Sequence, residues 1–249
     1  MTSPAGLEHL VKNLPAIRKR EQIDFCIVNG ENASLITGIS PEAAKKLLAA
    51  GADVITGGNH TMRNRNLFGM LDEDGRLLRP INFGGGVPGA GYGVYDACGY
   101  RVLVLNAMGN VHMEPHLDAP LPFLERALAR EAGKYDLAVL DIHAEATGEK
   151  LAIGYALDGR VTAVFGTHTH VPTADERILP CGTGYLSDVG MCGESGGILG
   201  MDPDVVLRRA RTHLAEKFVP AAGPCVANAV IFTIDERRAV TTAVRRLNF

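Results

Sequence analysis

The sequence predicts an α/β fold, organised as one large domain over residues 1–249. Short apolar runs typical of buried strands alternate with segments in which apolar residues recur at helical spacing. Several of these runs end in polar clusters, as the strands of a parallel sheet do where they meet a ligand crevice. A chain of 249 residues that is 46% hydrophobic can also bury the large core that such a fold requires.

The first quarter of the chain predicts two helices and two strands. Apolar residues at helical spacing predict a helix over residues 6–19, and no strand comes before it, which is unusual for this fold class. A second helix is predicted over 40–50, because a serine N-cap and a proline in the first turn mark its start. The apolar runs 25–28 and 53–56 predict buried strands. Each strand stops at a polar cluster, which is Asn29-Gly30-Glu31-Asn32 for the first and Gly57-Gly58-Asn59-His60 for the second.

The rest of the chain continues the alternation of strands and helices. Segments 92–98 and 101–105 predict a hairpin that turns at Gly99-Tyr100. The glycine-rich stretch 84–91 lacks the Gly-Lys-Ser/Thr sequence of a P-loop and opens no helix, so we interpret it as turns. The remaining predicted elements are, in chain order, a helix at 121–132, a strand at 137–142 that leads to His143, a helix at 149–157, strands at 161–165 and 184–190, a helix at 205–217, and an antiparallel pair of strands at 226–234 and 239–247.

The composition excludes several classes of partner. A net charge of -3 offers no basic surface for extended nucleic acid, whereas a small phosphate ester held by metal ions stays compatible with it. No apolar run reaches the roughly eighteen residues of a membrane span, and the first residues lack the features of a signal peptide. The five cysteines are odd in number and form no Cys-x-x-Cys pair, as in reduced cytoplasmic proteins. We therefore expect a cytoplasmic protein without a membrane partner, whose apolar composition is compatible with a homo-oligomer.

Four predicted strands end in polar side chains that favour a metal site. Gly166-Thr167-His168-Thr169-His170 follows the strand 161–165, and two histidines separated by one residue in an extended segment point to the same side. If the strands are parallel, this pair converges with the other three clusters at one edge of the sheet. The set of imidazoles, one carboxylate and two side-chain amides is typical of manganese, iron or zinc sites. It is too large for one four-coordinate ion and favours two ions bridged by the carboxylate. The candidate residues are Glu31, Asn32, Asn59, His60, His143, His168 and His170.

Each of these residues also has an ordinary interpretation. His-x-His pairs arise by chance, and a histidine such as His143 after an apolar run is more often a hydrogen-bonded structural residue than a ligand. Asn29 and Asn59 have about even odds of being turn residues. Glu31 in isolation would be a solvated surface carboxylate. The metal-site hypothesis therefore depends on all of these features sharing one location.

Five motifs along the chain are distinctive in combination. They are Asn29-Gly30-Glu31-Asn32-Ala33, Gly58-Asn59-His60, His143-Ala144-Glu145-Ala146-Thr147, Gly166-Thr167-His168-Thr169-His170-Val171-Pro172-Thr173-Ala174-Asp175 and Asp188-Val189-Gly190-Met191. Together they resemble the YmdB-like branch of the bacterial calcineurin-like metallophosphoesterases, and the resemblance covers nearly the whole chain. It implies a four-layer α/β/β/α fold that hydrolyses phosphodiesters, 2′,3′-cyclic nucleotides in particular. The resemblance also implies two divalent metal ions, with iron or manganese preferred and zinc as a further option.

The resemblance implies a role for each candidate residue. Glu31 would bridge the two ions. The first ion would be bound by Asn32 and His170, and the second by Asn59, His143 and His168. His60 would lie near the ions without binding them and protonate the leaving oxygen, because a side chain with a pKa near neutrality suits a general acid.

One part of the family pattern is absent from this sequence. The family begins with a strand that ends in an aspartate ligand of the first metal, whereas this chain opens with the helix at 6–19. Our hypothesis is that about one strand was lost upstream, with Met1 in the place of the family's valine through a GTG codon read as a start. A lost central strand exposes the backbone edges of its neighbours. We therefore expect weakened occupancy of the first metal site.

The sequence thus predicts a metal-dependent phosphoric ester hydrolase. A hydroxide activated by the two cations would attack phosphorus in line, and opening a 2′,3′-cyclic nucleotide at its 2′ oxygen would leave a 3′-monophosphate. Two alternatives stay open. One is a phosphomonoesterase on the same centre, and the other is a regulatory protein that binds a nucleotide or a metal with little turnover.

Overall fold

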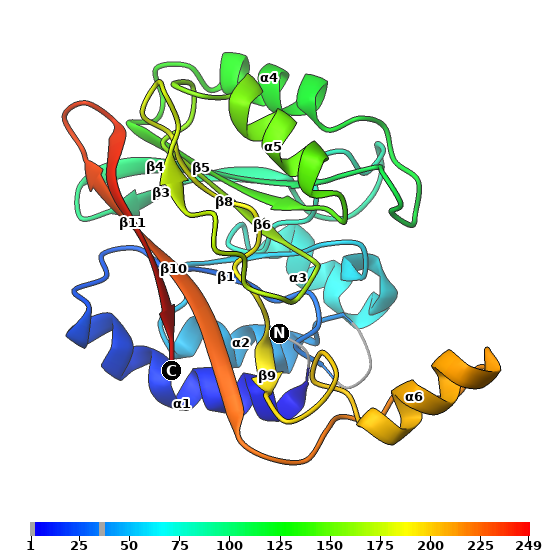
Figure 1. Ribbon diagram of the computed structural model, residues 1–249. Coiled ribbons are helices and arrows are strands. Elements are labelled where there is room, and N and C mark those ends of the chain that lie inside the picture. The colour runs from blue at the N-terminus through cyan, green and yellow to red at the C-terminus, as the bar shows by residue number, and fades with distance from the viewer. Residues whose placement is uncertain (1–2, 35–37) are drawn as a thin grey trace.

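The computed structural model describes residues 3–34 and 38–249, which form four layers (Figure 1). Helices α4 (Leu121–Arg130) and α5 (Thr147–Ala156) cover the outer face of a six-stranded sheet. A second layer of strands faces the inner side of that sheet. Helices α1 (Pro4–Arg20) and α2 (Pro41–Ala49) cover the far side of the second layer. The α/β/β/α arrangement that the resemblance implies is therefore confirmed.

The six-stranded sheet has the order β3-β4-β5-β6-β8-β7. Its four inner strands are parallel and its two edge strands are antiparallel to their neighbours. All residues of β5 are buried, because helices cover one face of the sheet and strands cover the other. The predicted hairpin is confirmed as β3 and β4. The strands are β3 (Tyr92–Ala97), β4 (Tyr100–Met108), β5 (Leu137–His143), β6 (Ala163–Thr167), β7 (Arg177–Ile178) and β8 (Gly184–Leu186).

The second strand layer consists of two separate sheets. In one, β1 (Ile27–Asn29) pairs in parallel with β2 (Val54–Thr56). In the other, β10 (Cys225–Asp235) lies between β9 (Cys192–Glu194) and β11 (Val240–Asn248), and the predicted antiparallel pair of β10 and β11 is confirmed. The expectation that β1, β2, β5 and β6 share one sheet edge is wrong. The polar ends of β1 and β5 meet because two sheets face each other and are joined by side chains, not by a backbone ladder.

Local sequence explains where the helices of the second layer begin. Ser3 caps α1 and Ser40 caps α2, and the hydroxyl of each accepts a hydrogen bond from a backbone N–H three residues later, at 3.0 and 3.1 Å. Each cap is followed by a proline, whose fixed φ suits the first helical position. Leu7, Leu10 and Leu14 form the buried stripe of α1 and join the core cluster under α2.

A cavity of about 730 Å³ lies between β1 and β10. Ile27, Phe165 and Phe232 line its apolar part, and it extends to Glu31 and His170. Within the described part of the chain, β1 has β2 as its one paired strand, so its second backbone edge has no strand partner there.

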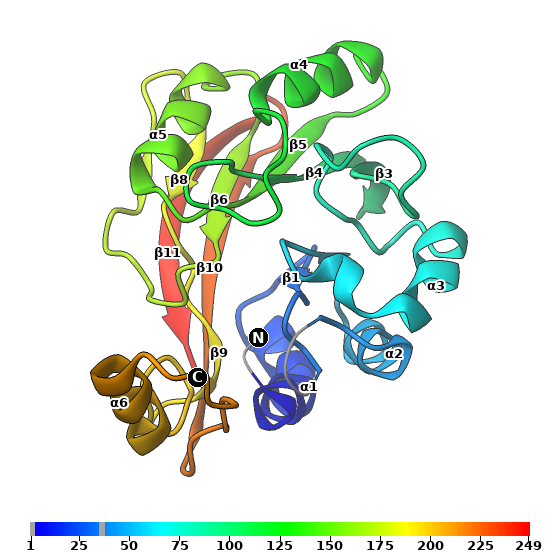
Figure 2. The same cartoon turned by 90° about the vertical axis from the view of Figure 1, so that its right-hand side faces the viewer.

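The remaining elements lie outside the main layers. They include α3 (Phe68–Glu73), two short 3-10 helices (Thr61–Arg63 and Arg65–Leu67) and α6 (Pro203–Thr212). Helix α6 lies at the end of the molecule opposite α4, as both views show (Figures 1 and 2). Among the residues that the structure describes, no helix combines the length and the apolar character needed to cross a membrane.

Candidate metal centre

Glu31 is a buried carboxylate two residues after β1, with 3% of its surface exposed. Its backbone N–H donates to Asn29 Oδ1 (3.2 Å), and its Oε1 accepts from the backbone N–H of His60 (2.8 Å). Burial alone would raise the pKa of Glu31, but neighbouring His143 and His60 lower it to about 2. Glu31 is therefore ionised inside the protein, and the interpretation of it as a surface residue is wrong.

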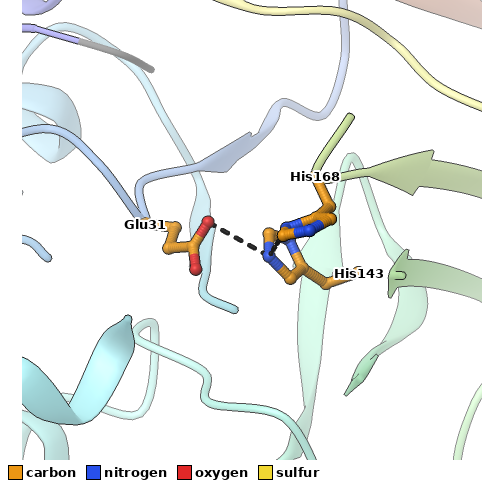
Figure 3. A group of neighbouring side chains, drawn as sticks. All are labelled: Glu31, His143 and His168. Carbon is orange, nitrogen blue, oxygen red and sulfur yellow. Dashed lines mark hydrogen bonds and ion pairs between the residues drawn. The ribbon is translucent and has the colours of Figure 1, made fainter. Parts of the chain in front are cut away.

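His143, the last residue of β5, brings several candidate ligands together. Its Nε2 lies 3.1 Å from Glu31 Oε2, 3.0 Å from Asn59 Oδ1 and 3.1 Å from His168 Nδ1. Glu31, His143 and His168 offer ligand atoms that all lie within 4.8 Å of one another (Figure 3). A buried carboxylate, two imidazole nitrogens and an amide oxygen that converge in this way fit a divalent cation.

A hydroxyl and a carboxylate fix the ring of His143. Thr167 lies opposite His143 in the β5–β6 register and donates its hydroxyl proton to Asp141 Oδ1 (2.8 Å). A hydroxyl has a single proton, so Thr167 accepts in its contact with His143 Nδ1 (2.9 Å), and that nitrogen carries the ring N–H. Asp141 also accepts from Asn29 Nδ2 (2.9 Å) and Thr56 Oγ1 (2.5 Å). His143 Nε2 therefore carries the lone pair that a metal ion would use, as in sites where an outer residue orients a ligating histidine.

His168 and His170 lie in a turn and not in an extended segment, which corrects the sequence prediction. Strand β6 ends at Thr167, and the backbone φ is 101° at His168 and 70° at His170. The side-chain alternation of a strand therefore does not apply to them. His168 Nδ1 meets His143, and its Nε2 lies 3.1 Å from Glu145 Oε2. His170 lines the cavity, and burial lowers its pKa to about 4.

His60 and Asn32 lie beside the carboxylate of Glu31. Asn32 Oδ1 is 2.9 Å from His60 Nδ1, and Asn59 Nδ2 is 3.4 Å from His60 Nε2. Burial lowers the pKa of His60, although the charge of Glu31 opposes the shift. The ring is therefore neutral near pH 7, with Nδ1 held by Asn32.

The seven candidate residues do not all contact one another. Glu31, Asn59, His143 and His168 form one contiguous set around His143 Nε2. Asn32 touches this set through Glu31, since Asn32 Nδ2 lies 3.4 Å from Glu31 Oε2. His170 is outside the group of three close His and Glu ligands found among the described residues. The ligands expected for the second ion therefore lie closer together than those expected for the first.

Several residues outside the seven candidates hold the site in shape. Asp141 and Thr167 orient His143. The one signal in the sequence that could have marked Asp141 is an acidic residue inside the apolar run 137–142. Asn29, considered as a turn residue, instead donates across the layers to Asp141. A side-chain carbon at Gly58 would collide with Nε2 of His143, so only glycine fits there.

Comparisons with known proteins match the whole chain. The family model described as YmdB-like protein matches residues 1–247. A 2′,3′-cyclic-nucleotide 2′-phosphodiesterase of Bacillus subtilis strain 168 is 39% identical over 242 residues, which are 97% of this chain and 91% of the relative. A crystal structure of a hypothetical protein from Thermus thermophilus has a TM-score of 0.91 and 36% identity, covering 100% of this chain and 95% of that one. A structure described as a novel phosphatase from Mycoplasma pneumoniae has a TM-score of 0.91 and 32% identity, with 100% and 90% covered.

Proposed function

The chain belongs to the YmdB-like protein family and is a phosphoric ester hydrolase, and we propose that it hydrolyses 2′,3′-cyclic nucleotides to 3′-monophosphates with two divalent cations. The observation that carries the proposal is the convergence of Glu31, Asn59 and His168 on Nε2 of His143. The name of the Bacillus subtilis relative, at 39% identity, supports the class of substrate.

The donor set divides into two groups around Glu31. His143 and His168 would hold one cation together with Asn59, because their ligand atoms already face one another. Asn32 and His170 would hold the other cation, with Glu31 between the two groups. Bound divalent cations would supply positive charge beside the phosphate and a water of lowered pKa.

His60 is assigned to proton transfer at the leaving 2′ oxygen. Its Nδ1 donates to Asn32 Oδ1, so Nε2 is the nitrogen that takes up a proton from solvent and passes it to the leaving oxygen. Because burial lowers the pKa of His60, this acid acts through its minor protonated form at pH 7. Its backbone N–H is tied to Glu31 Oε1, so the ring is held close to the carboxylate without taking a ligand position. A positioned acid of this kind typically contributes about 10²- to 10⁴-fold to the rate.

The proposal is tested with 2′,3′-cyclic AMP as substrate and chromatography of the products. Purified protein is assayed with Mn²⁺ or Fe²⁺, and again after treatment with a chelator. The expected result is 3′-AMP as the sole product, formed only with the metal. Formation of 2′-AMP, or equal turnover in the chelated protein, would overturn the proposal.

A phosphomonoesterase is the second candidate, because one structural neighbour is described as a phosphatase. The same protein is assayed with p-nitrophenyl phosphate at equal metal concentration. We expect slower turnover than with the cyclic nucleotide, and faster turnover would favour the second candidate. A regulatory protein would instead show thermal stabilisation by the nucleotide without any cleavage above the metal-free control.

A further inference from the structure

A buried ion pair lies next to the turn that carries His168 and His170. Lys150 and Asp188 are each 1% exposed, and Lys150 Nζ lies 2.8 Å from Asp188 Oδ2. Removing two charges from water is costly, and an apolar pair of similar size is often at least as stable. The Lys150–Asp188 pair therefore has to be explained by something other than the stability of the fold.

The carboxylate of Asp188 binds Thr169, the residue between the two histidines. Its Oδ2 accepts from both the backbone N–H (3.0 Å) and the hydroxyl (2.8 Å) of Thr169. Its Oδ1 accepts from the backbone N–H of Gly190 (2.8 Å). His168 and His170, on either side of Thr169, have φ of 101° and 70°, a conformation that side-chain-bearing residues rarely adopt. Such backbone persists only where the surroundings hold it, and Asp188 is the carboxylate that does so here.

Lys150 links this turn to the strand that carries His143. It belongs to α5, which begins four residues after His143. The lysine stem passes over Gly166, where an added side-chain carbon would come within 2.8 Å of Lys150 Cδ. Because Gly166 has no side chain, the side chain of Lys150 can pass it, and the Lys150 ammonium group reaches Asp188.

We propose that Lys150 and Asp188 are positioning residues that hold the His168–His170 turn so that His168 Nδ1 meets His143 Nε2. The inference rests on the proposed metal-dependent function. Asp188 fixes the backbone at Thr169, and Lys150 supplies the counter-charge that keeps Asp188 in place. Neither residue touches the candidate cation, and their effect reaches it through His168.

The test compares Mn²⁺ affinity in Asp188→Asn, Lys150→Met and the double variant, measured by competition with a chelating dye. Asp175→Asn is the matched control, because the carboxylate of Asp175 accepts from the backbone N–H and the hydroxyl of Ser187, just after β8, and not from Thr169. The double variant removes both charges, so it avoids the buried unpaired charge that destabilises each single variant. Circular dichroism and thermal unfolding without metal identify the variants that keep the wild-type fold.

We expect Mn²⁺ to bind about 10- to 100-fold more weakly to the folded variants at 150 and 188, as for other residues that orient ligands. The control should stay within about threefold of the wild type. If a folded Asp188→Asn or double variant binds Mn²⁺ as tightly as the control does, the positioning role is refuted while the proposed function stands. If the wild type itself binds no Mn²⁺, the proposed function fails and the positioning role fails with it.

Discussion

Replacing Thr167 by valine removes one hydroxyl from the centre of the site and changes the side-chain shape little. That hydroxyl donates to Asp141 Oδ1 and accepts from His143 Nδ1, at 2.8 and 2.9 Å. Without it, the N–H of His143 loses its acceptor and the ring is no longer held with Nε2 toward Glu31. We predict both a loss of stability and a loss of metal affinity.

The size of each loss follows from the two bonds. A hydrogen bond to a charged partner contributes about 1.5 to 3 kcal/mol and a neutral one about 0.5 to 1.5 kcal/mol, so Thr167→Val should lower the free energy of unfolding by about 2 to 4.5 kcal/mol. Loss of an outer residue that orients a metal ligand typically costs about 10- to 100-fold in metal affinity. Urea unfolding of the chelated protein measures the first quantity, and Mn²⁺ competition with a dye measures the second.

Thr183→Val is the control for this prediction. Thr183 is fully buried, and its hydroxyl also makes two hydrogen bonds, donating to the carbonyl of Val161 (2.6 Å) and accepting from the N–H of Gly159 (2.9 Å). Neither partner is a candidate ligand. Thr183→Val should therefore lose stability and keep its Mn²⁺ affinity. Equal Mn²⁺ affinity in the two folded variants would refute the role of Thr167 in orienting His143.

Three further predictions concern the proton donor, the two metal positions and pH. His60→Ala should keep its bound metal, measured by elemental analysis, and lose about 10²- to 10⁴-fold in turnover of substrates with poor leaving groups; unchanged turnover would exclude the acid role. Mn²⁺ titration followed by calorimetry should show one tighter and one weaker site, with His168→Ala removing the tighter and His170→Asn the weaker, and two equal sites would contradict this. The pKa of His170 falls from 6.5 to about 4 on folding, so the metal-free unfolded chain takes up a proton that the folded one does not. The stability of the metal-free wild type should therefore be complete above pH 6.5 and fall toward pH 4, and His170→Asn, which tolerates positive φ, should remove on the order of 3 kcal/mol of that loss. Parallel pH curves of urea unfolding for the two proteins would show that His170 is not responsible.

Local patterns in the sequence predicted most elements but could not predict how the strands are shared between sheets. The run 25–28 and the run 161–165 have the same apolar character, yet β1 lies in a two-stranded sheet and β6 in a six-stranded one. Strand pairing depends on contacts far apart in the chain, which apolar periodicity does not record. The candidate residues were nevertheless brought near one another, because the side chains of one sheet reach across to the other.

The turn at His168 and His170 shows a different limit of sequence reasoning. A His-x-His pair after an apolar run fits the alternation of a strand, and positive φ at residues other than glycine is too rare to expect. The hydrogen bonds that accompany this conformation are donated by Thr169 to the carboxylate of Asp188, nineteen residues further along the chain. No local pattern around the histidines contains that information, although Asp188 itself belongs to one of the recognised motifs.

Asp141 gives a physical reason why two separate sheets build one site. Its carboxylate accepts hydrogen bonds from Asn29 of β1, Thr56 of β2 and Thr167 of β6, while Asp141 itself belongs to β5. Burial raises the pKa of Asp141, and the three donors oppose that shift by favouring the ionised form. A neutral residue of the same shape could not accept from all three donors, and the unpaired groups would remain buried at the contact between the sheets. The carboxylate thus joins the carboxyl ends of four strands, close in sequence to the candidate ligands that follow each of them. The geometry at the candidate metal centre therefore depends on a residue that is not expected to bind the metal.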